Sequence, residues 1–278
     1  MKILTIMGGP RKGYGTILIE RFESELKLIQ DVEFEYLYLK DYNLESCRGC
    51  LNCFFWGEDK CPFRDDDRNE IFNMMDQADG IIFMAPVYAL HIPALMKNFF
   101  DRFSYIFHRP YFFGKIAIGV SNHGISGSKK ITQYFNDVAT SWGFTFVDHL
   151  EFSTMPTGGR EKKIVKKMRK TCKKFIKALN GQRYHRPSLG EVLAFKIRKL
   201  LHNIAKDETN ADFKYWLEQG WLEEDRKFYY DVRIGTGKKI VAGLINIIVK
   251  PIFKKMFTED PKVVYKRYLK FETLNLKT

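Results

Sequence analysis

Short apolar runs alternate with amphipathic segments over the first 180 residues of the chain. The apolar runs predict strands over 2–7, 33–39, 80–87, 114–121 and 144–151. Apolar residues at helical spacing predict helices over 16–29, 68–78, 92–105, 128–142 and 160–180. Continuous apolar strands that alternate with helices are typical of a parallel sheet covered on both faces. We therefore expect an α/β fold with a five-stranded, doubly wound parallel sheet.

This alternation stops after Gly181, where the pattern predicts helices alone, over 189–205, 210–219 and 238–257. The predicted organisation is a ligand-binding sheet domain over 1–182 and a mainly helical, basic C-terminal extension over 183–278. Within the extension, residues 240–249 form an apolar run flanked by lysines. The run predicts a buried helix or a subunit contact, and the alternative is a helix that lies on anionic lipid.

The formal net charge of +13 is concentrated in the C-terminal part of the chain. Residues 1–159 carry 16 basic and 20 acidic side chains, whereas residues 160–182 carry 10 and 1. The segment 160–180 also has an apolar stripe that includes Cys172, so we expect it to dock on the sheet with a solvated basic face. The charge suits a phosphorylated cosubstrate or a lipid surface, and the lack of a recognised motif argues against nucleic acid.

The apolar run in the N-terminal segment MKILTIMGGPRKG is too short for a secretory signal peptide, and no run reaches the ~20 apolar residues of a spanning helix. We therefore expect a cytoplasmic protein. Four of the five cysteines, Cys47, Cys50, Cys53 and Cys61, follow the pattern C-x2-C-x2-C-x7-C. In a reducing compartment such thiols indicate an iron–sulfur cluster, a zinc ion, or free thiols with a labile disulfide.

Three loops are candidates for ligand binding, because open parallel sheets bind ligands outside the carboxyl ends of their strands. They are residues 8–16, 86–91 and 122–128. The first joins a predicted strand to a predicted helix and reads GGPRKGYGT from Gly8 to Thr16. Glycines let the backbone approach a phosphate, and a helix N-terminus offers N–H donors to it.

Three motifs carry a resemblance to a known family. GGPRKGYGT is similar to the G-S-P-R-x-x-x-N-T phosphate loop of the flavodoxin-like NADPH-dependent FMN reductases. FMAPVYALHIPALMKNFFDR, residues 83–102, resembles the second signature of that family, and CRGCLNCFFWGEDKCPFRDDD, residues 47–67, resembles the cysteine insert of its iron–sulfur flavoproteins. The resemblance covers about residues 1–180 and implies a flavodoxin-like fold with FMN at the carboxyl ends of the strands.

The resemblance also implies roles for particular residues. Those expected to hold the FMN phosphate are Gly9, Pro10, Arg11, Lys12, Gly15 and Thr16. Those expected to line the flavin ring are Pro86, Val87, Tyr88 and Ala89, with Asn122, His123 and Gly124 at its pyrimidine edge. In the iron–sulfur flavoproteins the same cysteine spacing holds a [4Fe–4S] cluster. Gly9 and Gly15 replace a usual Ser and Asn, so we expect backbone amides to hold most of the phosphate.

The implied function is an FMN-dependent NAD(P)H oxidoreductase that passes electrons to a quinone, a free flavin, a nitro compound or an iron–sulfur centre. No side-chain acid or base is required, because the flavin does the chemistry. One alternative is an electron-transfer protein with a ferredoxin-like partner, and another is a zinc-stabilised module that binds a membrane or nucleic-acid surface. We also expect a homodimer or higher oligomer, and a purely structural ion pair between Asp101 and Arg102.

Overall fold

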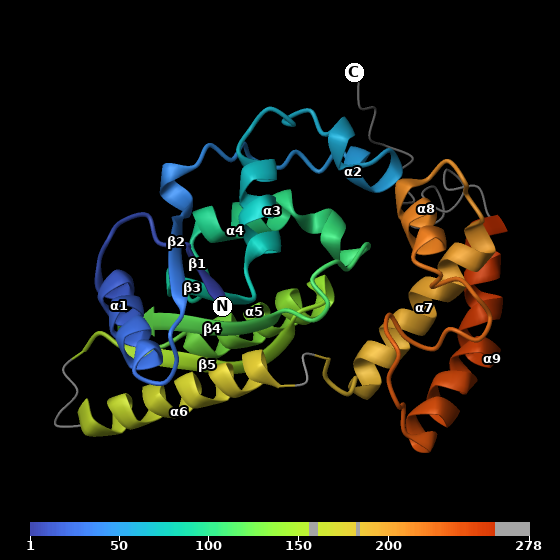
Figure 1. Cartoon of the computed structure of the whole chain (residues 1–278). Coiled ribbons are helices and arrows are strands. Elements are labelled where there is room, and N and C mark those ends of the chain that lie inside the picture. The colour runs from blue at the N-terminus through green and yellow to red at the C-terminus, as the bar shows by residue number, and fades with distance from the viewer. Residues whose placement is uncertain (156–160, 182–183, 259–278) are drawn as a thin grey trace. The chain divides into compact units, whose positions relative to one another are not determined.

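The computed structural model describes residues 1–155, 161–181 and 184–258. The chain divides into two compact units, Met1–His185 and Arg186–Thr278, which are taken separately below. The first unit has a central sheet with helices on both faces (Figure 1). In the described part of the second unit the only regular elements are helices.

The sheet has five parallel strands in the order β2-β1-β3-β4-β5. Their bounds are β1 Lys2–Met7, β2 Glu33–Tyr38, β3 Gly80–Pro86, β4 Ile116–His123 and β5 Thr145–Ser153. The predicted fold class is confirmed. The predicted strand over 114–121 is displaced by two residues, because Gly114 takes a φ of +81° and turns the chain before β4 begins.

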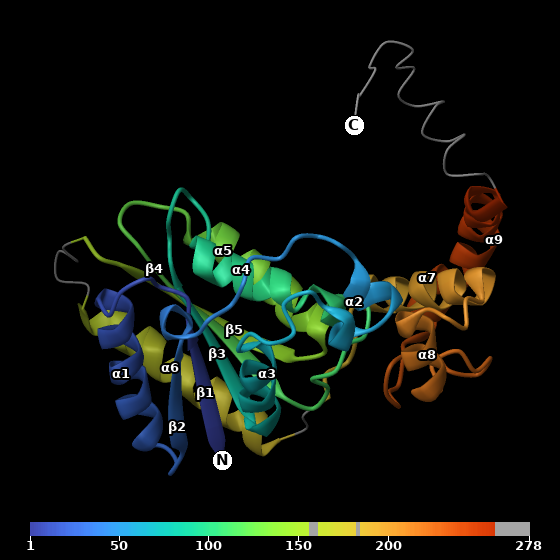
Figure 2. The same cartoon turned by 90° about the horizontal axis from the view of Figure 1, so that it is seen from above.

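Successive residues of the strands pack into two different cores, because side chains of a strand alternate between its faces. Ile3 and Ile82 lie in one core with α1, Tyr14–Lys27, and α6, Glu161–Asn180. Leu4 and Phe83 lie in the other core, formed with α3, Arg68–Gln77, α4, Ala94–Arg102, and α5, Ser128–Trp142. In Figure 2, which views the sheet from above, α4 lies in front of the sheet and α6 lies behind it. The predicted doubly wound arrangement is therefore confirmed.

Short helical turns connect these elements. They are η1 Leu39–Asp41, α2 Asn52–Phe55, η2 Glu58–Lys60 and η3 Ser104–Phe107. The predicted helix over 92–105 is shorter than expected, because α4 begins only after Pro93 and ends at Arg102. The chain then tightens into η3, and α2 with η2 belongs to the cysteine segment.

The second unit contains α7, Leu189–Ala205, α8, Ala211–Glu218, and α9, Thr236–Thr258. A capping box starts α7, since the Glu191 amide donates to Ser188 Oγ and the Ser188 amide donates to the Glu191 carboxylate. Trp216 is fully buried and packs against rings of α7 and the loop before α9. No helix in the described part of the chain is long and apolar enough to cross a membrane.

The apolar run 240–249 is only partly covered within this unit. Ala242 is fully buried, whereas Ile240, Val241 and Leu244 are 62%, 43% and 48% exposed. The side chains of residues 245–249 lie outside the described residues. Of the expected alternatives, a buried helix is therefore wrong at residues 240, 241 and 244, and a subunit contact stays a prediction.

One buried histidine makes the sheet domain sensitive to acid. His149 of β5 places Nε2 3.0 Å from Ser121 Oγ of β4. Gly119 leaves room for the ring, because an added Cβ would lie 2.4 Å from His149 Nδ1. Burial lowers the pKa of His149 to about 3, and the charge of Lys167 acts in the same direction.

Replacing His149 with Gln should flatten the acid limb of the stability curve. Below about pH 6.5 the unfolded wild-type chain binds a proton that the folded chain excludes, so stability falls by up to about 1.4 kcal/mol per pH unit. His149→Gln removes this proton and keeps a side chain that can hydrogen-bond with Ser121 Oγ. Urea denaturation of both proteins between pH 7 and pH 5 measures the difference in slope. Parallel curves would contradict a neutral buried His149.

Candidate functional site

A cavity of about 640 Å³ opens at the carboxyl ends of β1, β3 and β4. The parallel register aligns its floor, since Met7 is paired with Tyr38 and Met84, and Pro86 is paired with Asn122. The loops after β3 and β4 lie side by side (Figure 2), and the Val87 amide donates to the Asn122 carbonyl at 2.8 Å. The cavity is lined by Met7, Gly9, Pro10, Arg11, Lys12, Gly13, Tyr14, Gly15, Thr16, Ile17, Tyr38, Met84, Pro86, Val87, Tyr88, Asn122, His123, Gly124 and Thr154.

The first wall is the glycine-rich loop at the start of α1. Gly13 is the N-cap residue, the described structure has no side-chain cap there, and the first turn carries no acidic residue. This helix end therefore presents its positive dipole end to the cavity without a competing carboxylate. Lys12 Nζ lies 4.5 Å from the centre of the Tyr38 ring, which holds one cation at the rim.

Gly15 packs closely against Met84 behind this wall. A Cβ at this position would lie 2.5 Å from the terminal methyl carbon of Met84 and 3.5 Å from Asn122 Oδ1. A larger residue would therefore need Met84 to move. The 3.5 Å distance also shows that the Asn122 side chain lies beside the glycine-rich loop.

Two buried polar atoms of the cavity walls are left without hydrogen bonds. Thr16 Oγ1 and Asn122 Oδ1 have no partner among the described residues. An unsatisfied buried hydroxyl or amide oxygen costs about 1–3 kcal/mol, so such atoms usually mark a missing ligand or water. Both atoms belong to residues that line the cavity, which makes it the natural site for a polar ligand.

The second wall is a strained turn that presents Tyr88. The amides of Tyr88 and His91 donate to each other's carbonyls at 2.8 and 2.9 Å, and between them Ala89 and Leu90 take φ values of +48° and +65°. Positive φ at both central residues defines a type I′ turn, which non-glycine residues rarely adopt. Tyr88 remains 41% exposed, so its ring is available to a planar ligand.

All predicted residues of the flavin site except Ala89 line this cavity. Ala89 instead shapes the turn beside it. His91 also lies off the wall, where its ring packs on Tyr134. The prediction missed Met7, Gly13, Tyr14, Ile17, Tyr38, Met84 and Thr154. Tyr38 and Thr154 could have been found, because each lies at or just beyond the carboxyl end of a predicted strand.

A second, smaller hollow of about 40 Å³ lies in the cysteine segment, and we call it the thiol hollow. Its lining includes Cys47, Cys50, Cys53 and Cys61, together with Arg48, Phe54, Phe63, Arg68, Asp101 and Arg102. Gly49 and Leu51 take left-handed φ values of +65° and +62°, which turn the chain tightly between the cysteines. All four thiols are free, and in the described part of the chain no three His, Cys, Asp or Glu side chains are close enough together to hold a metal ion.

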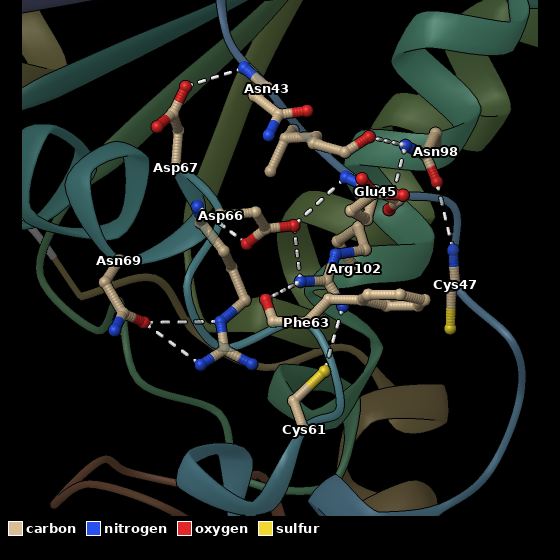
Figure 3. Close-up of polar contacts among 12 residues, drawn as sticks. Asn43, Glu45, Cys47, Cys61, Phe63, Asp66, Asp67, Asn69, Asn98 and Arg102 are labelled. Atoms are coloured by element: carbon tan, nitrogen blue, oxygen red, sulfur yellow. Dashed lines mark hydrogen bonds and ion pairs between the residues drawn. The ribbon is translucent and has the colours of Figure 1, made fainter.

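Arg102 is the main polar contact of the thiol hollow (Figure 3). Its NH1 donates to Cys61 Sγ at 3.0 Å, and its NH2 donates to Asp66 Oδ2 at 2.7 Å. The expected Asp101–Arg102 pair is wrong, because Asp101 pairs with Lys97, one helical turn earlier. Sequence proximity suggested the wrong partner, since Asp66 reaches Arg102 only through the fold of the cysteine segment.

The cysteines differ in their electrostatic surroundings. Burial raises the pKa of the Cys53 thiol to about 11. Burial also acts against ionisation of Cys61, but the hydrogen bond and charge of Arg102, with the Phe63 backbone, outweigh it and lower the pKa of that thiol. Arg109 supports the other side of the segment, where it donates to the Cys53 carbonyl at 2.6 Å and to Glu58 at 2.8 Å.

The fold and these two sites define an α/β protein with a phosphate-type loop and a cysteine-rich insert. The chain belongs to the NADPH-dependent FMN reductase family, whose model matches residues 1–155. Membership of this family makes it an FMN-dependent oxidoreductase.

Two relatives match most of the chain. An iron–sulfur flavoprotein of Archaeoglobus fulgidus is 28% identical over 80% of this chain and 100% of its own. An iron–sulfur flavoprotein of Clostridioides difficile is 30% identical over 79% of this chain and 99% of its own. These shares exceed what residues 1–182 can supply, so the similarity extends into the C-terminal part, where the sequence motifs gave no sign of it.

Solved structures support the fold. An NADH:FMN oxidoreductase in its apo form superposes with a TM-score of 0.51 at 18% identity, over 66% of this chain and 94% of its own. A flavone reductase superposes with a TM-score of 0.52 at 19% identity, over 66% of each chain.

The strained turn generates a paired stability prediction. Ala89→Gly should raise the free energy of unfolding by about 0.5–1 kcal/mol, because glycine accepts a left-handed φ without a Cβ penalty. Ala89→Val should lower it by at least about 1 kcal/mol, because a β-branched side chain is least tolerant of that conformation. Urea denaturation of the two variants checks the opposite signs. A loss of stability in Ala89→Gly would contradict strain at this position.

Proposed function

We propose that residues Gly9–Thr16 bind the phosphate of FMN and that Pro86, Val87 and Tyr88, with Asn122, His123 and Gly124, hold its ring. The observation that carries this is the pair of unsatisfied buried atoms, Thr16 Oγ1 and Asn122 Oδ1, in a cavity that also contains an uncapped helix N-terminus. A phosphorylated planar ligand would supply hydrogen-bond partners for these atoms and negative charge for the helix N-terminus. When bound, FMN accepts hydride from NAD(P)H and passes electrons on.

Different residues of the cavity suit different parts of FMN. The helix N-terminus and Arg11 offer positive potential to a phosphate, and the Thr16 hydroxyl can donate to it. Asn122 Oδ1 is an acceptor, so its free position suits an N–H or O–H donor of the flavin and not the phosphate. Tyr88, Pro86 and Val87 offer aromatic and apolar surface for the ring and exclude water from it.

Thr16→Val should weaken FMN binding at least about tenfold, because a hydrogen bond to a charged group is lost while the side-chain shape is kept. The matched control is Thr5→Val. Thr5 Oγ1 is also buried without a partner, but Thr5 does not line the cavity. Titration of apoprotein with FMN, followed by flavin fluorescence, measures both. Equal weakening in the two variants would show that Thr16 has no direct role.

We further propose that Cys47, Cys50, Cys53 and Cys61 hold a [4Fe–4S] cluster. Support comes from the four cysteines that line one hollow and from the left-handed turns at Gly49 and Leu51, which bring them close along the chain. The buried side chains of Arg102 and Arg109 add positive charge beside it. The names of both relatives also describe iron–sulfur flavoproteins.

Two measurements on anaerobically purified protein test this assignment and the direction of electron flow. Metal analysis should find iron with acid-labile sulfide, whereas zinc or no metal would contradict the cluster. NADPH or NADH should bleach the flavin bands promptly, because hydride transfer requires only a bound ring and access to it. A silent flavin that a reduced ferredoxin-like protein bleaches would instead favour electron transfer without a nicotinamide step.

The remaining proposals concern assembly and location. The exposed side chains of Ile240, Val241 and Leu244 on α9 favour a homo-oligomer, and a monomer by light scattering would contradict it. Neighbouring lysines make peripheral contact with an anionic membrane the alternative for this surface, and flotation with anionic vesicles would reveal it. The five free thiols favour a reducing compartment, such as the cytoplasm.

A further inference from the structure

One face of α4 contacts both ends of the cysteine segment. Asn98 and Arg102 are one helical turn apart, so their side chains leave the helix on the same side (Figure 3). Asn98 Oδ1 accepts from the Cys47 amide at 3.3 Å, and Asn98 Nδ2 donates to the Leu44 carbonyl at 2.9 Å. Arg102 reaches the last cysteine of the set. The helix therefore holds the first cysteine by its backbone and the last by its sulfur.

The guanidinium of Arg102 is fixed in direction. The side chains of Arg102 and Asp66 are each only 2% exposed, and NH2 donates both to Asp66 Oδ2 at 2.7 Å and to the Phe63 carbonyl at 2.9 Å. These contacts orient the planar fork, so NH1 is directed at Cys61 Sγ.

Asp66 is held as firmly as its partner. Its carboxylate also accepts from the Glu45 amide at 3.0 Å and from the Arg68 amide at 3.2 Å. The carboxylate cannot rotate away without breaking several hydrogen bonds. The ion pair is therefore part of the wall of the thiol hollow and keeps the N–H donor on the sulfur.

We propose that Arg102 is a positioning residue of the redox centre in the thiol hollow, where its hydrogen bond to Cys61 Sγ raises the reduction potential. This inference rests on the proposed [4Fe–4S] centre. Gain of an electron makes the centre more negative, and a donor on a ligating sulfur stabilises the more negative state. Asp66 has the opposite effect through its own negative charge, while it keeps Arg102 oriented.

The position of α4 relates the reduction potential of the cysteine centre to electron transfer from the flavin. The helix begins three residues after His91, which closes the turn beside the FMN cavity, and it ends at the thiol hollow. Met96 of the same short helix packs on Gly8, next to the glycine-rich wall of the FMN cavity, and Asp101 and Arg102 line the thiol hollow. The potential of the cysteine centre sets how readily it accepts an electron from reduced flavin.

Two substitutions should move the potential in opposite directions. In Arg102→Lys the ammonium can pair with Asp66 but cannot also reach the sulfur and the Phe63 carbonyl, so the potential should fall. We expect a roughly tenfold lower ratio of reduced to oxidised centre at fixed ambient potential, which is about 59 mV for one electron. Asp66→Asn removes a buried negative charge and keeps an acceptor for Arg102, so the potential should rise.

Asn98→Ala is the matched control on the same helix face. It breaks the contact with the Cys47 backbone but touches no sulfur, so it should lower the iron retained while leaving the potential of the remaining centres unchanged. Loosening of the segment alone would give all three variants the same behaviour. Opposite shifts in Arg102→Lys and Asp66→Asn have no such explanation.

The experiment is an anaerobic redox titration of full-length wild type and the three variants after reconstitution with iron and sulfide, followed by electron paramagnetic resonance. A lower potential in Arg102→Lys, or a higher one in Asp66→Asn if the lysine variant does not fold, supports the inference. Wild-type potentials in both variants would overturn it while leaving the centre intact. Wild-type protein that binds no iron would overturn the proposed centre itself, and the role of Arg102 with it.

Discussion

The parallel direction of all five strands is the constraint on which both sites depend. Because every strand ends at the same edge of the sheet, the loops after β1, β3 and β4 must meet there, and the register sets Pro86 beside Asn122. The two cores on either side of the sheet hold that edge rigid. The cavity is thus a consequence of topology, and the side chains at its walls decide which ligand it accepts.

The cysteine segment depends on the same sheet indirectly, through helix α4, which packs on the sheet. It follows β2 at the edge of the sheet and would have few contacts of its own, because its two short helical turns contain no buried residue. Polar side chains of α4 and the loop after η3 hold it instead, namely Asn98 and the buried Arg102 and Arg109. The buried Arg102–Asp66 ion pair costs desolvation, but it fixes the direction of the guanidinium beside the thiols of the proposed centre.

Local patterns predicted the elements well, and long-range contacts account for most of the differences. The apolar strands and the glycine-rich loop are each encoded by a few consecutive residues, so their approximate bounds could be predicted from the sequence. The pairing of Arg102 with Asp66 joins residues 36 apart, and the left-handed conformations of Ala89 and Leu90 carry no glycine to mark them. The partial exposure of α9 likewise depends on what packs against it, which periodicity does not specify.

The charge of the chain is separate from this chemistry. The apolar stripe of α6 is buried through Met168, Cys172 and Phe175, so its lysines form the outer surface of the sheet domain. The proposed chemistry uses a few buried cations and one helix end. The most direct test of the central claim, a phosphate-binding flavin site at the edge of the sheet, is titration of the apoprotein with FMN and with riboflavin. The account predicts one FMN per chain and at least about hundredfold weaker binding of riboflavin, which lacks the phosphate. Equal affinity for the two flavins would contradict it.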